Sequence, residues 1–275
     1  MKIVLQFLTW LVLVLYFISF GNYLFYFRFK KEETECKLRL WLPAAVVCHT
    51  IYIVLLGLRL QHIPVGDVFQ VLTTCAWFFV LVYLVLEIRV KVMTMGVFFL
   101  PIILVLHGIS SMFIDFDKPL PELLSSILLF EVHVAIMISA YAAFCISFIT
   151  SIMYILLARE MRTRKLGIFF QRLPSLEYVD RLSNHAVNIG LGLVTVGIAL
   201  GFYMGMNVWE GKWALDPKLL AVVISWIIYV VHYVTRRTIG WQGRRAAVIS
   251  VVGFNWLLFS FIIVNLFFST FHNFQ

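Results

Sequence analysis

Long apolar runs, separated by short polar loops, cover almost the whole chain. A helix that crosses a membrane needs about 20 mostly apolar residues, and runs of this length recur along the sequence. We predict eight such helices, over residues 3–27, 41–60, 68–88, 95–114, 124–158, 186–206, 217–236 and 246–270. The pattern therefore predicts an all-α membrane protein, a bundle of eight transmembrane helices that forms a single membrane domain over residues 1–275.

The loops between the predicted helices differ in charge. Those after the first, third, fifth and seventh helices hold most of the 22 Lys and Arg residues. The opposite loops are acidic or aromatic, as in residues 115–122 and 207–218. Because cytoplasmic loops of membrane proteins carry an excess of Lys and Arg, both chain ends are predicted to lie outside the cytoplasm (N-out/C-out).

Composition supports the membrane assignment. Hydrophobic residues make up 62% of the chain, charged residues only 13%, and the mean hydropathy of +0.96 exceeds what a soluble domain exposes. The net charge of +8 lies in short loops, so it reflects topology and predicts no nucleic-acid partner. The four cysteines form no Cys-x-x-Cys pair, which argues against a disulfide framework or a covalent haem attachment motif.

Four of the seven histidines fall at two depths on different predicted helices. His49 lies about eight residues, roughly 12 Å, from the cytoplasmic end of its helix, and His232 about five residues, roughly 7 Å. His133 lies in the outer part of the fifth helix, and His272 follows the outer end of the eighth. Depth thus gives one buried pair and one outer pair, as haem ligation by two imidazoles requires.

A different interpretation of the same histidines stays open. Polar side chains inside membranes often form hydrogen bonds with a neighbouring helix, and each histidine could serve only that purpose. His107 follows Pro101 by six residues and could serve a pathway through the membrane or bond to a carbonyl freed by a proline kink, and we expect the second.

The loop before the seventh helix is aromatic. Trp209 and Trp213 are four residues apart. They suit the aromatic belt at a membrane surface or, if the loop is helical, stacking on a flat apolar ligand. Asp216 followed by Pro217 is typical of a helix start, with the aspartate as N-cap and proline at the first helical position.

Several motifs resemble the CcsA/HemX branch of the cytochrome c assembly proteins. The similar segments are Glu131-Val-His133, Leu193-Val-Thr-Val-Gly-Ile-Ala-Leu-Gly201, Trp213-Ala-Leu-Asp-Pro-Lys218 ahead of His232, and Gly240-Trp-Gln-Gly-Arg-Arg-Ala-Ala247. The resemblance implies a haem-handling protein of the bacterial inner membrane. It implies that His133 and His272 ligate haem beside the loop with Trp209, Trp213 and Asp216. His232 would belong to a buried haem site, with His49 as the partner that depth suggests. The expected cofactor is one or two non-covalently bound haem b groups, with the histidines on the iron.

The tryptophan-rich motif of this family is incomplete here. The family pattern has tryptophan where this chain has Leu215, and glutamate and tryptophan where it has Leu219 and Ala221. These departures favour the HemX-like subgroup, which the resemblance associates with control of glutamyl-tRNA reductase.

We therefore expect a haem-binding protein of cytochrome c biogenesis that delivers haem to the outer face. Two alternatives stay open, a HemX-like regulator whose basic segment 159–184 docks glutamyl-tRNA reductase, and a membrane redox protein with two haems. Candidate partners are haem, an apocytochrome c or second assembly subunit outside, and glutamyl-tRNA reductase inside. The sequence has no recognisable acid, base or nucleophile constellation, so no independent catalytic activity is expected.

Overall fold

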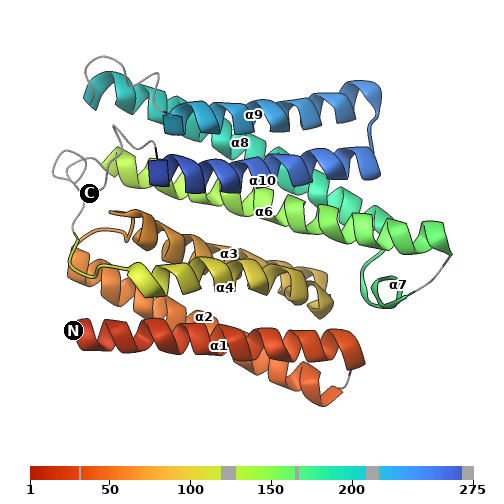
Figure 1. Cartoon of the computed structure of the whole chain (residues 1–275), viewed down its shortest axis with the longest axis horizontal. Helices are drawn as coiled ribbons and strands as arrows, with labels where there is room; N and C mark the ends of the chain where they lie inside the picture. The colour runs from red at the N-terminus through yellow and green to blue at the C-terminus, as the bar shows by residue number, and fades with distance from the viewer. Residues whose placement is uncertain (31, 119–127, 165–166, 209–216, 268–275) are drawn as a thin grey trace. The chain divides into compact units, whose positions relative to one another are not determined.

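The computed structural model describes residues 1–30, 32–118, 128–164, 167–208 and 217–267. Within these ranges the chain is helical and contains no β-strand (Figure 1). The α-helices in chain order are α1 (Lys2–Phe29), α2 (Glu32–Leu60), α3 (Val68–Val90), α4 (Gly96–Phe113), α6 (Leu128–Thr163), α7 (Ile168–Arg172), α8 (Leu176–Val208), α9 (Pro217–Val234) and α10 (Arg244–Phe267). A short 3-10 turn, Met93–Met95, precedes α4, and a π-helix, Thr235–Ile239, follows α9.

Seven helices in the described ranges are long and apolar enough to cross a membrane. They coincide with the first seven predicted helices, which confirms a multi-pass helical membrane protein. The eighth predicted helix, over residues 246–270, corresponds to α10, which is not among these seven. The count of eight and the outward position of both chain ends stay predictions.

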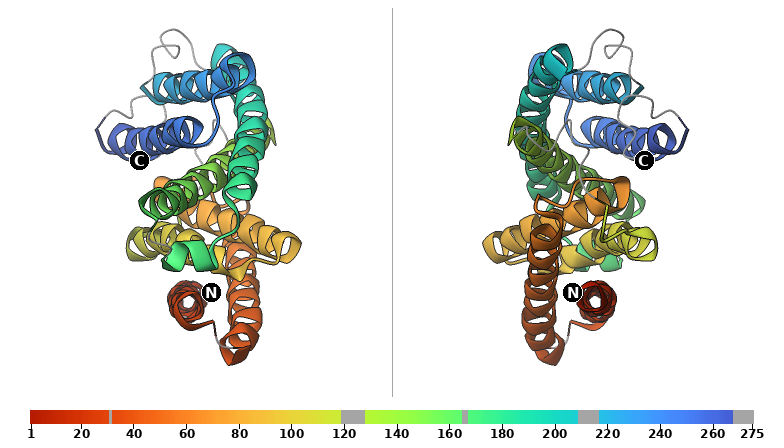
Figure 2. Two further views of the ribbon diagram at one scale, coloured as in Figure 1. Left: turned by 90° about the vertical axis from the view of Figure 1, so that its right-hand side faces the viewer. Right: turned by 90° about the vertical axis from the view of Figure 1, so that its left-hand side faces the viewer.

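The helices group into two compact units. In the first, α1 to α4 form a ring in which each helix packs on the next and α4 packs on α1 (Figures 1 and 2). In the second, α6, α8, α9 and α10 form a ring of the same kind, closed by contact between α6 and α10. The single domain predicted for residues 1–275 stays a prediction.

Local sequence sets several helix boundaries. The side chain of Asp67 caps α3 by accepting a hydrogen bond from the Gln70 backbone N–H at 2.7 Å. α9 begins at Pro217, the position predicted for the proline. At the other ends, α1 and α3 are each followed by a lysine in the left-handed conformation, Lys30 and Lys91.

In the second unit, α6 and α8 pack closely because α8 carries glycines at the contact. A Cβ atom on Gly190 would lie 2.6 Å from the Phe144 ring, and one on Gly197 would overlap the Met137 sulfur. Small residues of this kind let membrane helices approach each other. This approach brings the side chains of α6 and α8 together at the candidate site.

Candidate functional site

His232 lies in the second unit, on the last turn of α9. Its side chain is 1% exposed, and its Nδ1 atom has no hydrogen-bond partner among the described residues. A buried polar atom without a partner is costly and calls for an explanation, such as a ligand that the structure does not contain. One turn earlier, the buried ring of Tyr229 stacks on Phe144 with 3.6 Å between centroids. His232 is therefore a buried imidazole beside an aromatic stack.

An ion pair fixes the segment that follows His232. Arg236 donates two hydrogen bonds to Asp180, at 2.6 and 3.1 Å, and the Gly243 backbone N–H donates to the same carboxylate at 3.1 Å. Asp180 thus ties α8 to the π-helix after α9 and to the start of α10. The π-helix Thr235–Ile239 is a rare element that is often found at functional sites.

Asp180 was not among the site residues predicted from the sequence. The available signal was an acidic residue inside the basic segment 159–184, since a carboxylate among arginines favours a specific ion pair, but Glu160 and Glu177 lie in the same segment and share this signal. The neighbouring cations are also engaged, because Arg237 lies 5.6 Å from the Tyr233 ring and Arg245 lies 5.7 Å from the Trp241 ring.

His133 is half-buried on α6 and faces α8. Its Nδ1 atom lies 3.0 Å from the carbonyl oxygen of Gly197, which accepts the hydrogen bond. Because a carbonyl only accepts, Nδ1 carries the proton, and the lone pair of the neutral ring is on Nε2. Metal-binding histidines use this arrangement, in which the second nitrogen donates to a carbonyl. A Cβ atom on Gly201 would lie 3.2 Å from this ring, so the glycine leaves room for it.

Four predicted site residues lie outside the described residues. They are His272, Trp209, Trp213 and Asp216. Within the described ranges, no group of three or more His, Cys, Asp and Glu side chains has the arrangement of a metal site.

His49, the predicted partner of His232, lies in the first unit, so the two residues belong to different units. Both of its ring nitrogens have partners there. Nδ1 lies 2.7 Å from the Tyr16 hydroxyl and Nε2 lies 3.0 Å from the Thr73 hydroxyl. The pairing of His49 with His232 stays a prediction, and the observed contacts place His49 in a local network.

The second histidine of this network is His107, whose ring centroid lies 4.6 Å from that of His49. Its Nε2 atom lies 3.0 Å from the carbonyl oxygen of Thr9 on α1. The expected bond to a carbonyl of its own kinked helix was therefore wrong, because the ring points across to another helix. Hydropathy gives the depth of His107, whereas its direction depends on helix packing.

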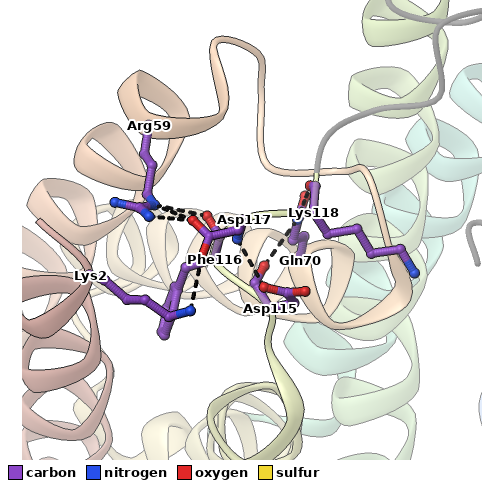
Figure 3. Close-up of polar contacts among 7 residues, drawn as sticks. All are labelled: Lys2, Arg59, Gln70, Asp115, Phe116, Asp117 and Lys118. Carbon is purple, nitrogen blue, oxygen red and sulfur yellow. Dashed lines mark hydrogen bonds and ion pairs between the residues drawn. The ribbon is translucent and has the colours of Figure 1, made fainter.

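An ionic cluster lies at one end of the first unit (Figure 3). Asp117 receives hydrogen bonds from Lys2 at 2.9 Å and from the guanidinium of Arg59. These two cations, Lys2 first, hold the pKa of the Asp117 carboxyl below its usual range. The cluster connects the start of α1, the end of α2 and the loop after α4.

Beside the cluster, the fully buried Gln70 organises the same loops. Its side-chain amide donates to the Lys118 carbonyl at 3.0 Å (Figure 3). The amide oxygen accepts from the Gly66 backbone N–H at 2.9 Å. Burial raises the pKa of the neighbouring carboxyl of Asp67, partly offset by the hydrogen bond from the Gln70 backbone. Hydrogen bonds and ion pairs therefore hold both the loops and the charged side chains at this end of the first unit in defined positions.

The sequence matches the Cytochrome C assembly protein family over residues 65–272. Among relatives, the chain is 30% identical over 231 residues to "Cytochrome c biogenesis protein CcsA" of Mesostigma viride, covering 75% of each chain. It is 26% identical over 260 residues to the protein of the same name from Chlorella vulgaris, covering 81% of each. For the Gloeobacter violaceus protein of that name, identity is 25% over 259 residues, covering 74% of this chain and 76% of the relative.

These matches do not specifically support the HemX-like subgroup, since the relatives reported above are all named CcsA. They agree with the wider resemblance found in the sequence. The family match covers the segments that contain His133 and His232, and it includes more than half of the chain. The chain therefore belongs to the Cytochrome C assembly protein family.

Proposed function

We propose that this chain acts in cytochrome c biogenesis by holding haem in the membrane and presenting it for transfer to an apocytochrome c. Family membership and the similarity to proteins named CcsA support the role in cytochrome c assembly. We further propose a bacterial inner membrane as its location, with both chain ends outside the cytoplasm, because the basic loops alternate with acidic and aromatic ones.

The observation that carries the haem proposal is the buried Nδ1 atom of His232 without a partner. A buried imidazole with an unpartnered nitrogen suits a haem ligand, and the ring of Tyr229, stacked on Phe144, lies one turn earlier on the same helix. Haem b, when bound, supplies the iron and the macrocycle that is passed on. His232 would bind the haem iron, and the ion pair of Asp180 with Arg236 would fix the helix end on which His232 lies.

His133 is the proposed ligand of a second, outer haem. Its Nδ1–H is already oriented by the carbonyl of Gly197, so the ring is held in the tautomer that coordinates a metal through Nε2. His272 as its partner, and Trp209, Trp213 and Asp216 as the adjoining loop, enter the proposal on sequence grounds alone.

His49 fits the haem site less well than His232. Both of its nitrogens form hydrogen bonds, to Tyr16 and Thr73, so ligation would require one of them to be given up. We therefore leave His49 out of the proposed haem site, and the ligand opposite His232 is not assigned. We propose neither glutamyl-tRNA reductase as a partner nor a redox role, because no contact described above favours them.

The proposal is tested on the purified full-length protein by an absorption spectrum and pyridine haemochrome quantification. We expect bound haem in the wild type and a loss of haem in His232→Ala, because that change removes the proposed iron ligand. Free imidazole added to His232→Ala should restore haem binding, since it can enter the vacated space and ligate the iron.

The matched control is His62→Ala, which removes a histidine from a loop outside the helices. Its haem content should equal that of the wild type. A His232→Ala protein with wild-type spectrum and haem content would contradict the assignment of this residue, and a haem-free wild type, produced with ample haem, would contradict the function.

A further inference from the structure

A continuous hydrogen-bonded chain crosses the middle of the first unit. It runs from the Tyr16 hydroxyl to His49 (2.7 Å), from His49 to the Thr73 hydroxyl (3.0 Å), and from Thr73 to Nδ1 of His107 (3.0 Å). The last link joins Nε2 of His107 to the carbonyl of Thr9 (3.0 Å). All five residues are at most 1% exposed, and together they come from all four helices of the ring.

One carbonyl fixes the direction of every bond in this chain. The Thr9 oxygen only accepts, so His107 donates from Nε2 and the neutral ring accepts at Nδ1. Thr73 must then donate to His107 and accept from Nε2–H of His49, which leaves Nδ1 of His49 to accept from Tyr16. The donors therefore all point the same way, from Tyr16 towards Thr9.

Polar side chains extend this chain towards the helix end beside Asp117. The Thr9 hydroxyl lies 3.3 Å from the Ser111 hydroxyl, and Ser111 donates to the His107 carbonyl at 2.6 Å. Ser111 is two residues before the last residue of α4, Phe113. The polar chain thus comes within about 3 Å of this helix end, given the rise of 1.5 Å per residue.

In the opposite direction, the buried face of α1 continues with hydroxyl groups. Ser19 and Tyr23, both fully buried, follow Tyr16 by three and seven residues, so they lie on the same side of the helix. Tyr23 donates to the carboxylate of Glu87 at 2.6 Å, and Tyr83 donates to the same carboxylate. Glu87 is only three residues before the end of α3.

A glycine makes room for the carboxylate end. A Cβ atom on Gly96, at the start of α4, would overlap the Tyr23 ring and lie 2.7 Å from the Tyr83 hydroxyl. The absence of a side chain there lets both tyrosines reach Glu87. The unit therefore places a buried carboxylate near one membrane face and two imidazoles in its interior.

We propose that the first four-helix unit conducts protons between its two ends, along Glu87, Tyr23, Ser19, Tyr16, His49, Thr73 and His107 to Ser111. Ionisable and hydroxyl groups are expensive inside a membrane, and rows of Glu and His side chains there are typical of proton relays. This inference does not rest on the proposed haem site, which lies in the second unit.

Each transfer along the central links conserves protons. A proton that arrives on Nδ1 of His49 releases the Nε2 proton to Thr73, whose own hydroxyl proton passes to Nδ1 of His107. The Nε2 proton of His107 faces the Thr9 carbonyl, which cannot pass it on, so the ring must turn to give this proton to the Thr9 hydroxyl. The Thr9 hydroxyl then passes its own proton to Ser111, and Ser111 releases its proton at the helix end.

Between Tyr16 and Tyr23 the described hydrogen bonds do not form a continuous link, because Ser19 donates to the Leu15 carbonyl at 2.8 Å. The Ser19 hydroxyl must turn away from this carbonyl for a proton to pass between the two tyrosines.

Further titratable side chains lie in this interior. Besides the residues of the proposed path, those that the structure buries in the first unit are Tyr26 on α1, Tyr52 on α2, the α3 cap Asp67, and Cys75 and Tyr83 on α3. Tyr52 packs against both imidazoles, with centroids 5.9 Å from His49 and 6.0 Å from His107. None of these additional groups is a cation, whose positive charge would oppose the passage of a proton.

The experiment uses the full-length protein in vesicles of phosphatidylcholine and phosphatidylglycerol that enclose a pH-sensitive dye. A potassium gradient with valinomycin drives protons inward, and the initial rate of internal acidification is measured. We expect a faster rate than in protein-free vesicles. Thr73→Val should slow the protein-dependent rate by about tenfold or more, because its methyl group breaks the link between the two histidines.

Two controls separate this effect from loss of structure. Thr73→Ser keeps the hydroxyl and should acidify the vesicles at the wild-type rate. Thr74→Val removes the neighbouring buried hydroxyl, which donates to the Pro64 carbonyl and is not part of the proposed proton path, so its rate should also equal that of the wild type. Glu87→Gln tests the carboxylate end and should slow the rate even if Thr73→Val does not fold. A wild-type rate equal to that of empty vesicles, or an unchanged rate in a folded Thr73→Val or Glu87→Gln protein, overturns the proposal.

Discussion

The carboxylate of Asp180 accepts two hydrogen bonds from the guanidinium of Arg236, at 2.6 and 3.1 Å. Both side chains are largely buried, at 16% and 14% exposed. Arg236 follows His232 by four residues, so this pair holds the segment that carries the proposed haem ligand. The ion pair therefore has two effects: it stabilises the second unit, and it fixes the position of the helix end that carries His232.

Replacing Asp180 with alanine should strongly destabilise the second unit. The change leaves a buried guanidinium without its partner, which typically costs about 3–5 kcal/mol. Thermal unfolding in detergent micelles would record the loss. The control is Glu177→Ala, which breaks the exposed pair with Arg181 at 3.6 Å. Such surface pairs contribute below about 1 kcal/mol, so equal effects of the two changes would contradict the assigned role of Asp180.

Gly190→Ala should destabilise the packing of α6 against α8. The added Cβ atom would meet the Phe144 ring at 2.6 Å, and this ring is stacked on Tyr229 and has little room to move. Overpacking of this kind costs about 1–3 kcal/mol. Gly192→Ala is the matched control, since a Cβ atom there meets nothing within 4 Å. We expect Gly192→Ala to be neutral or slightly stabilising, because alanine favours helix more than glycine does.

Gly201→Val should disturb the outer haem site and leave the buried one intact. A single Cβ atom at this position would already lie 3.2 Å from the His133 ring, so a branched side chain displaces the imidazole. Pyridine haemochrome quantification should show a partial loss of haem, and Gly192→Val should show none. Full haem content in Gly201→Val would argue against His133 as a ligand.

Acidification should weaken the ionic cluster at the end of the first unit. The pKa of Asp117 is lowered by Lys2 and Arg59, so its contribution to stability is present above the unfolded pKa of about 3.9. That contribution is lost as the pH falls through the folded pKa. Asp67 has a pKa raised by burial, so protonation of this carboxyl acts with the opposite sign.

The measurement compares melting temperatures between neutral and acidic pH. Asp117→Asn should show a smaller loss of stability on acidification than the wild type, because the residue that titrates favourably is gone. Asp67→Asn should show a larger loss, since it removes a group whose protonation opposes acid unfolding. Identical pH profiles for all three proteins would contradict both assignments.

The sequence was sufficient to predict the helices. Apolar run length identifies seven described membrane helices, and the proline at position 217 marks the start of α9. The boundaries were less accurate where polar residues continue a helix. The fifth predicted helix ended at residue 158, whereas α6 continues to Thr163 because its basic last turn can remain helical outside the apolar layer.

The contacts of the histidines could not be predicted in the same way. Hydropathy assigns a depth to each residue and contains no information on the direction in which its side chain points across the bundle. His49 and His107 meet through Thr73 because α2, α3 and α4 pack in one ring, and neither histidine is near Thr73 in sequence. For His133, the resemblance to a known family predicted a haem ligand, which stays a prediction, and the contact with the Gly197 carbonyl was not predicted.

The closed rings of helices also bear on how the chain is made. In the first unit the contact between α1 and α4 completes the ring, and every link from Tyr16 to Thr9 lies within these four helices. Helices enter a membrane in the order of synthesis, and units of a chain generally fold as they emerge. The buried histidines of the first unit can thus find their partners once α4 is inserted, before the ribosome has produced His232.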